Sequence, residues 1–179
     1  MKPVLYTQYP LTSILIYNGA TVLHFSLGGA GIILGYHSWA GYSLGVLYLL
    51  FAFTEMYLLM PLKVCPNCPY YLLTNSVCIS GLNLVSRRFV PAGNIKNFSE
   101  RASGSFCPNN LYIAGLVLPI LAISPALVID FSWVVLGILL MVIGLLAFRF
   151  FIIFPRIACG HCRAVNICPN ARSMKISTQ

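Results

Sequence analysis

Acidic residues are nearly absent from this sequence. Of 179 residues only three are acidic; charged residues of both signs make up 8% of the chain, and apolar residues make up 59%. A soluble globular domain carries roughly 25% charged residues, so this composition excludes a water-soluble fold. Three acidic residues also exclude most hydrolases that depend on carboxylate acid–base chemistry. We expect a membrane protein that is a non-catalytic subunit or, if an enzyme, a component of an oxidoreductase.

Because charges are scarce, four long apolar stretches run without interruption. Each approaches the roughly 20 residues that a helix needs to cross about 30 Å of hydrocarbon. They lack the alternation of barrel strands, and backbone polar groups in lipid must be satisfied within the segment. The predicted spans are residues 11–36, 41–62, 111–129 and 131–154. The predicted fold class is therefore an all-α integral membrane protein, with four transmembrane helices arranged as two tandem hairpins.

The short links between the paired spans, residues 37–40 and the surroundings of Asp130, contain no Lys or Arg. Nearly all positive charges fall on the opposite side: Lys2, Lys63, Arg87, Arg88, Lys96, Arg101, Arg156, Arg163, Arg172 and Lys175. The positive-inside rule predicts that this basic face and both termini are cytoplasmic. The net charge of +8 is thus a sign of topology and of attraction to anionic lipids, and we expect no nucleic-acid partner.

A motif of the form Pro-x-x-x-Cys-x-x-Cys occurs twice, at residues 61–68 and 155–162, with an offset of 94 residues. Proline disfavours a helical residue before it, so Pro61 and Pro155 are expected to mark where the second and fourth helices leave the bilayer. The repeat predicts three parts. Residues 1–69 and 111–179 are each a helical hairpin with a C-x-x-C turn, the second with a tail. Residues 70–110 form a cysteine-containing linker whose residues 70–90 could be an interfacial helix.

The predicted spans contain no cysteine. All seven cysteines lie on the basic face: Cys65, Cys68, Cys78, Cys107, Cys159, Cys162 and Cys168. Two C-x-x-C pairs supply the four thiolates of a tetrahedral zinc or iron site, and the remaining cysteines could complete a second one. Cysteine before proline is found in iron–sulfur ligand runs. In a reducing cytosol, zinc or an iron–sulfur cluster is favoured over disulfides; thiol–disulfide exchange is the alternative, and an inverted topology would favour disulfides.

Polar side chains are rare in the spans and are therefore functional candidates. Glu55 and Arg149 are related by the same offset of 94 residues, so they should lie at one depth and could pair. Alternatively, Arg149 extends to the headgroups. His24 lies near the middle of the first span, and Asn18 lies nearer the basic face at a depth similar to that of Glu55. These three residues form a candidate quinone site, although a lone histidine is more often satisfied by a neighbouring helix.

Two pairs of glycines, Gly31 with Gly35 and Gly41 with Gly45, flank the first short link at a spacing of four. Small residues at this spacing allow helices in membranes to approach closely. We expect them to join the first and second helices.

The cysteine pattern leads to one leading hypothesis and two alternatives. The first is a membrane-embedded subunit or anchor whose cytoplasmic zinc or iron–sulfur site organises the linker and docks a partner within a membrane complex. The second is a redox protein that passes electrons or thiol equivalents between a cytoplasmic partner and a quinone. The third, a soft-metal transporter, is less favoured because the spans offer no cysteine and hardly any His or Met in register.

Overall fold

The computed structural model describes residues 4–98, 108–168, 171, 172 and 174–176. It contains four helical stretches long and apolar enough to cross a membrane, at Leu11–Tyr36, Trp39–Asn67, Pro108–Ile129 and Trp133–His161. The described residues form no β-sheet, only one bridge between Gln8 and Val77. The prediction of an all-helical chain with four apolar helices of spanning length is confirmed.

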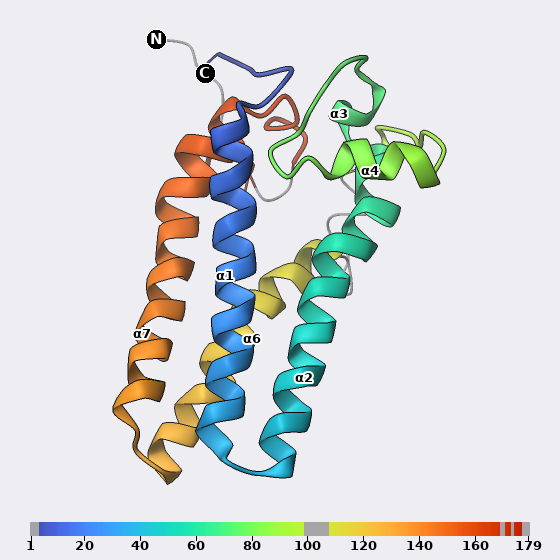
Figure 1. Ribbon diagram of the computed structural model, residues 1–179. Coiled ribbons are helices and arrows are strands. Elements are labelled where there is room, and N and C mark those ends of the chain that lie inside the picture. The colour runs from blue at the N-terminus through green and yellow to red at the C-terminus, as the bar shows by residue number, and fades with distance from the viewer. Residues whose placement is uncertain (1–3, 99–107, 169–170, 173, 177–179) are drawn as a thin grey trace.

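Three of the long helical stretches stand beside one another, and the remaining one, α6, crosses behind them at an angle (Figure 1). The short helices α3 and α4 lie at one end of the bundle, together with the ends of η1 and η3. The elements are α1 (Leu11–Tyr36), α2 (Trp39–Thr54), η1 (Glu55–Val64), η2 (Cys65–Asn67), α3 (Pro69–Leu72), α4 (Leu82–Phe89), α6 (Pro108–Ile129), α7 (Trp133–Phe148), η3 (Arg149–Ala158) and η4 (Cys159–His161).

The two copies of the sequence repeat have the same secondary structure. The elements α2 and α7 have 16 residues each, the π-helical segments η1 and η3 have 10, and the 3-10 turns η2 and η4 have three. Pro61 and Pro155 lie inside the π-helical segments, so the helices continue past both prolines. A proline lacks the amide proton for the regular helical bond, and the wider π-helical turn accommodates that loss.

Glycines bring the long helices into close contact, but only partly as predicted. A Cβ atom at Gly45 would lie 2.4 Å from the Ile33 side chain, so Gly45 faces α1 as expected. A Cβ atom at Gly31 would lie 2.5 Å from Ile123 of α6, and Gly35 likewise faces α6. The prediction that Gly31 and Gly35 join α1 to α2 is therefore wrong. Instead, Gly29 of α1 packs against Leu49 of α2.

Up to residue 90 the linker forms two short helices, α3 and α4, instead of one interfacial helix over residues 70–90. Its helix α4 lies across the direction of the long helices (Figure 1). The inner face of α4 is buried, and the Ser86 hydroxyl donates a hydrogen bond of 2.6 Å to the Pro61 carbonyl. The outer face exposes Leu84, Val85 and Phe89. This exposed apolar face of α4 resembles that of a helix lying at a membrane surface.

Candidate metal centre

The two C-x-x-C motifs form the same turn at the same end of the bundle. In the first, the Cys68 amide donates to the Cys65 carbonyl at 3.0 Å; in the second, the Cys162 amide donates to the Cys159 carbonyl at 3.1 Å. In each pair the first cysteine opens the 3-10 turn that directly follows a π-helical segment. The predicted structural equivalence of the two motifs is therefore seen at the level of the backbone.

The segment before α1 fastens these two turns together. The Tyr6 amide donates to the His161 carbonyl at 3.0 Å, and the Tyr6 ring stacks on the His161 ring with centroids 4.5 Å apart. The Tyr70 hydroxyl, from α3, donates to the Tyr6 carbonyl at 2.8 Å, and the Tyr9 hydroxyl donates to the Ala158 carbonyl. Sequence reasoning missed these tyrosines, because nothing local marks a contact between residues so far apart.

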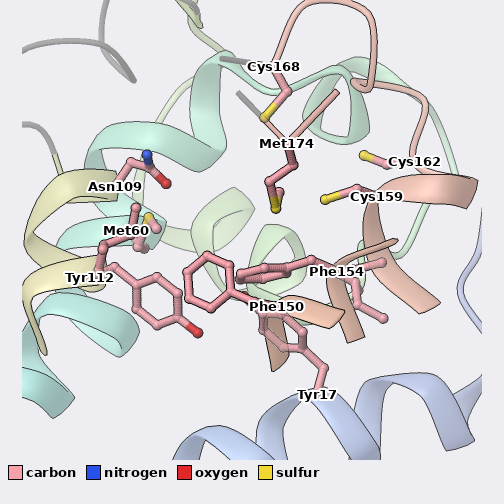
Figure 2. A pocket seen from close by; sticks show the side chains of 13 residues that line it. Tyr17, Met60, Asn109, Tyr112, Phe150, Phe154, Cys159, Cys162, Cys168 and Met174 are labelled. Atoms are coloured by element: carbon pink, nitrogen blue, oxygen red, sulfur yellow. The ribbon is translucent and has the colours of Figure 1, made fainter. Parts of the chain in front are cut away.

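Six cysteines surround two adjoining cavities at this end of the bundle. The first, which we call the thiol cavity, has a volume of about 200 Å³ and is lined by Cys65, Cys68, Cys78, Cys162 and Cys168. The second, which we call the aromatic cavity, has a volume of about 190 Å³ and is lined in part by Cys159, Cys162 and Cys168 (Figure 2). The two cavities share Cys162 and Cys168. The structure thus gathers every predicted cysteine ligand that it describes, and Cys107 lies outside the described residues.

The thiols are spread around these cavities instead of being clustered about one point. All six described cysteines are free. Among the described residues, no group of three or more His, Cys, Asp or Glu side chains is placed to hold one metal ion. His161, between the cysteines of the second pair, lines neither cavity, and its Nδ1 atom lies 2.9 Å from the Val4 carbonyl oxygen.

Burial raises the pKa of two of the thiols that line the thiol cavity. The pKa of Cys162 is raised to about 11, and the pKa of Cys68 is raised well above the ordinary range for a thiol. Cysteines that carry out thiol–disulfide exchange have lowered pKa values, because the thiolate is the attacking species. The raised pKa values of Cys68 and Cys162 therefore do not fit thiol–disulfide exchange.

Asn83 of α4 positions the loop that carries Cys78. Its side chain accepts a hydrogen bond of 3.0 Å from the Cys78 amide and donates one of 2.8 Å to the Ser76 carbonyl. One turn later, Arg87 donates to the Tyr70 carbonyl at 2.8 Å and to the Ser76 hydroxyl at 3.0 Å. Asn83 and Arg87, four residues apart, thus fix the thiol-bearing loop against α4.

Replacing Asn83 by alanine is expected to lower the free energy of unfolding by about 2 kcal/mol, since the change leaves buried backbone groups unpaired. It should also speed the alkylation of Cys78 by a maleimide in the metal-free protein. Both effects can be measured by chemical unfolding in detergent and by mass spectrometry of the labelled peptide. Leu84→Ala, on the exposed face of the same helix, is the control and should change neither; equal labelling of Cys78 in both variants would contradict the role of Asn83.

Arg149 is fully buried, so the alternative that it extends to the headgroups is wrong. Its guanidinium donates to Thr21 Oγ1 at 2.7 Å and to the Tyr112 hydroxyl, and it lies 5.3 Å from the centroid of the Tyr17 ring. No ion pair between Arg149 and Glu55 occurs in the described part of the chain. Glu55 is 2% exposed, and neither of its carboxylate oxygens has a hydrogen-bond partner there.

The other candidate residues inside the bundle have structural contacts. His24 is fully buried, and its Nε2 atom lies 2.9 Å from the Leu116 carbonyl oxygen of α6, as expected for a histidine satisfied by a neighbouring helix. The Asn18 side chain donates to the Ile14 and Ser80 carbonyls at 3.0 and 3.2 Å, which ties the linker to α1. Neither His24, Asn18 nor Glu55 lines the thiol cavity or the aromatic cavity.

A scan against protein-family models finds no match for this chain, and searches of curated proteins and of solved structures find none either.

Proposed function

We propose that this protein is a membrane-embedded subunit of a redox complex and that its thiol cavity holds an iron–sulfur centre. The observation that carries the proposal is the convergence of six cysteines from both repeats, the linker and the tail on two adjoining cavities. Thiolates are the preferred ligands of iron–sulfur clusters and of zinc, and burial in a cavity protects such a centre from water.

The spread of the thiols favours a cluster over a single zinc ion. A zinc site of four cysteines requires every sulfur to lie about 2.3 Å from one ion, and the described residues offer no group so compact. A cluster of several irons is larger and needs more widely spaced sulfurs. The residues that we expect to hold it are four that line the thiol cavity, Cys65, Cys68, Cys78 and Cys162. When bound, the centre would supply one-electron chemistry.

Other residues at this end of the bundle would hold the centre in place for a partner subunit. Tyr6, Tyr9 and Tyr70 tie the two C-x-x-C turns to each other, and Asn83 holds the loop of Cys78. By the positive-inside rule we place this end and both termini in the cytoplasm, where a partner subunit could dock on the linker. The matching lengths of α2, η1 and η2 with α7, η3 and η4 favour descent from a duplicated hairpin.

Metal analysis of protein purified without oxygen tests the proposal. We expect iron and acid-labile sulfide in near-equal amounts, with visible absorption that bleaches on reduction. Cys68→Ser and Cys162→Ser should each lose most of the iron. Cys159→Ser is the matched control, because Cys159 lines only the aromatic cavity, and this variant should keep its iron.

Two results would count against the iron–sulfur centre. Stoichiometric zinc without iron would favour a zinc-organised subunit instead. Protein with all seven thiols reduced and no bound metal of any kind would refute the metal-site proposal altogether. Size-exclusion profiles of the serine variants, compared with that of the unmodified protein, separate loss of a ligand from loss of the fold.

A further inference from the structure

The aromatic cavity extends from the cysteines into the helix bundle. Beyond the sulfurs, its walls are formed by Tyr17 of α1, by Tyr112 and Ile113 of α6, and by Phe150 and Phe154 of η3. Figure 2 shows the aromatic rings gathered at one end of the cavity, and the sulfurs of Cys159, Cys162 and Cys168 toward the other. An apolar cavity of about 150 Å³ holds one benzene molecule. The volume of about 190 Å³ is therefore suited to a single six-membered ring with small substituents.

Two phenol hydroxyl groups, those of Tyr17 and Tyr112, lie on the cavity wall. The Tyr112 hydroxyl accepts a hydrogen bond from Arg149, so its own proton is left for donation to a further acceptor. Because the buried Arg149 cation polarises the Tyr112 hydroxyl, this hydroxyl is a strong donor and suits a ligand with an acceptor oxygen.

We propose that the aromatic cavity binds the ring of a lipid-soluble quinone. The ring matches the volume and the aromatic walls, which favour offset or edge contacts with a flat π-system. A quinone carbonyl can accept a hydrogen bond from the Tyr112 hydroxyl. A fatty acyl chain offers this hydroxyl no acceptor, and the positive charge of Arg149 disfavours a cationic ligand.

The position of the cavity suits a ligand that arrives from lipid. Ile113 and Phe150, which face this cavity from two spanning helices, are partly exposed. His24, Asn18 and Glu55, the residues that the sequence alone suggested for a quinone, do not line this cavity. The binding site does not depend on the metal centre, although the two cavities share Cys162 and Cys168 and so adjoin each other.

Binding of duroquinone tests this inference. All four ring carbons that flank its carbonyls carry methyl groups, so it cannot add to the cysteines as less substituted quinones do. Equilibrium dialysis with the full chain in phosphatidylcholine nanodiscs, corrected with empty nanodiscs, gives the affinity. Durene, the same methylated ring without carbonyls, is the matched ligand. We expect saturable binding of duroquinone at one site per chain and roughly tenfold weaker binding of durene, which cannot accept a hydrogen bond.

A pair of tyrosine variants locates the site. Tyr112→Phe removes a hydroxyl on the cavity wall and should weaken duroquinone binding about fivefold. Tyr48→Phe is the matched control, since the buried Tyr48 hydroxyl donates to the Gly115 carbonyl and does not line the cavity. Its affinity should be unchanged.

Three results would overturn the quinone site: binding that does not saturate, equal affinity for durene and duroquinone, or equal affinity in Tyr112→Phe and Tyr48→Phe. If Tyr112→Phe fails to fold, the comparison of the two ligands on the unmodified protein still decides. Iron is measured on the same preparation, so that failure of the quinone proposal can be distinguished from failure of the metal proposal. Iron with no duroquinone binding refutes only the quinone site, and binding without iron refutes only the metal centre.

Discussion

Replacing Gly45 by leucine is expected to lower the free energy of unfolding by about 3 kcal/mol or to prevent folding. A Cβ atom at this position would lie 2.4 Å from Ile33 Cγ1 and 3.1 Å from the carbonyl oxygen of Gly29. The nearer contact is with a side chain, but the carbonyl oxygen belongs to the α1 backbone. The two helices would therefore have to separate, and overpacking of this kind costs roughly 1–3 kcal/mol or more.

Gly144→Leu is the matched control for Gly45→Leu. Gly144 lies within α7, and nothing comes within 4 Å of a Cβ atom built on it. Because leucine favours a helix over glycine by up to about 1 kcal/mol, Gly144→Leu should leave stability unchanged or slightly raised. Thermal unfolding of both variants in the same detergent checks the prediction. Equal unfolding temperatures would show that α1 and α2 do not approach closely at Gly45.

Replacing Arg149 by lysine is expected to destabilise the protein more than replacing it by methionine does. The planar guanidinium reaches Thr21 and Tyr112 together and stacks near the ring of Tyr17. An ammonium group is a compact and strongly hydrated charge that cannot make these contacts at once, so a lysine at this position would bury a poorly paired cation. We expect a loss of about 3 kcal/mol for Arg149→Lys, corresponding to the lost charge-assisted bonds.

Arg149→Met brings no charge into the interior, so its cost should be smaller, even though methionine is chemically less similar to arginine. Chemical unfolding of the two variants shows which of them has the lower free energy of unfolding. A lysine variant as stable as the unmodified protein, together with a clearly weaker methionine variant, would mean that positive charge alone matters at this position. The methionine variant should also weaken duroquinone binding, because Tyr112 loses the cation that polarises it.

The sequence predicts most of the fold because its strongest signal is physical and local. Apolar runs long enough to cross a bilayer become helices, and the offset of 94 residues predicts the matching lengths of α2 and α7 with the segments that follow them. The direction in which each glycine faces is less predictable. Gly31 and Gly45 belong to two glycine pairs with the same spacing, yet Gly31 contacts α6 whereas Gly45 contacts α1. Which helix a glycine contacts depends on how all four helices pack.

Of the candidate site, only the cysteines could be predicted from the sequence. Clustering of the cysteines outside the spans pointed to the residues that line the thiol cavity. The aromatic cavity could not be foreseen, since Tyr17, Tyr112 and Phe154 lie in three different helical elements and look like ordinary apolar residues in the sequence. Arg149 was noticed as a charge in a span, but its partners Thr21 and Tyr112 are brought to it by tertiary packing alone.

The contacts between the segment before α1 and the second C-x-x-C turn determine when this end of the bundle can form during synthesis. The contact from Tyr9 to Ala158 spans 149 residues, and that from Val4 to His161 spans 157. Residues 4–9 therefore meet these partners only once the chain has been made as far as residue 161, so the cysteine end cannot be completed before the helical stretch that ends at His161 has formed. Any metal centre built there must be assembled later than that step.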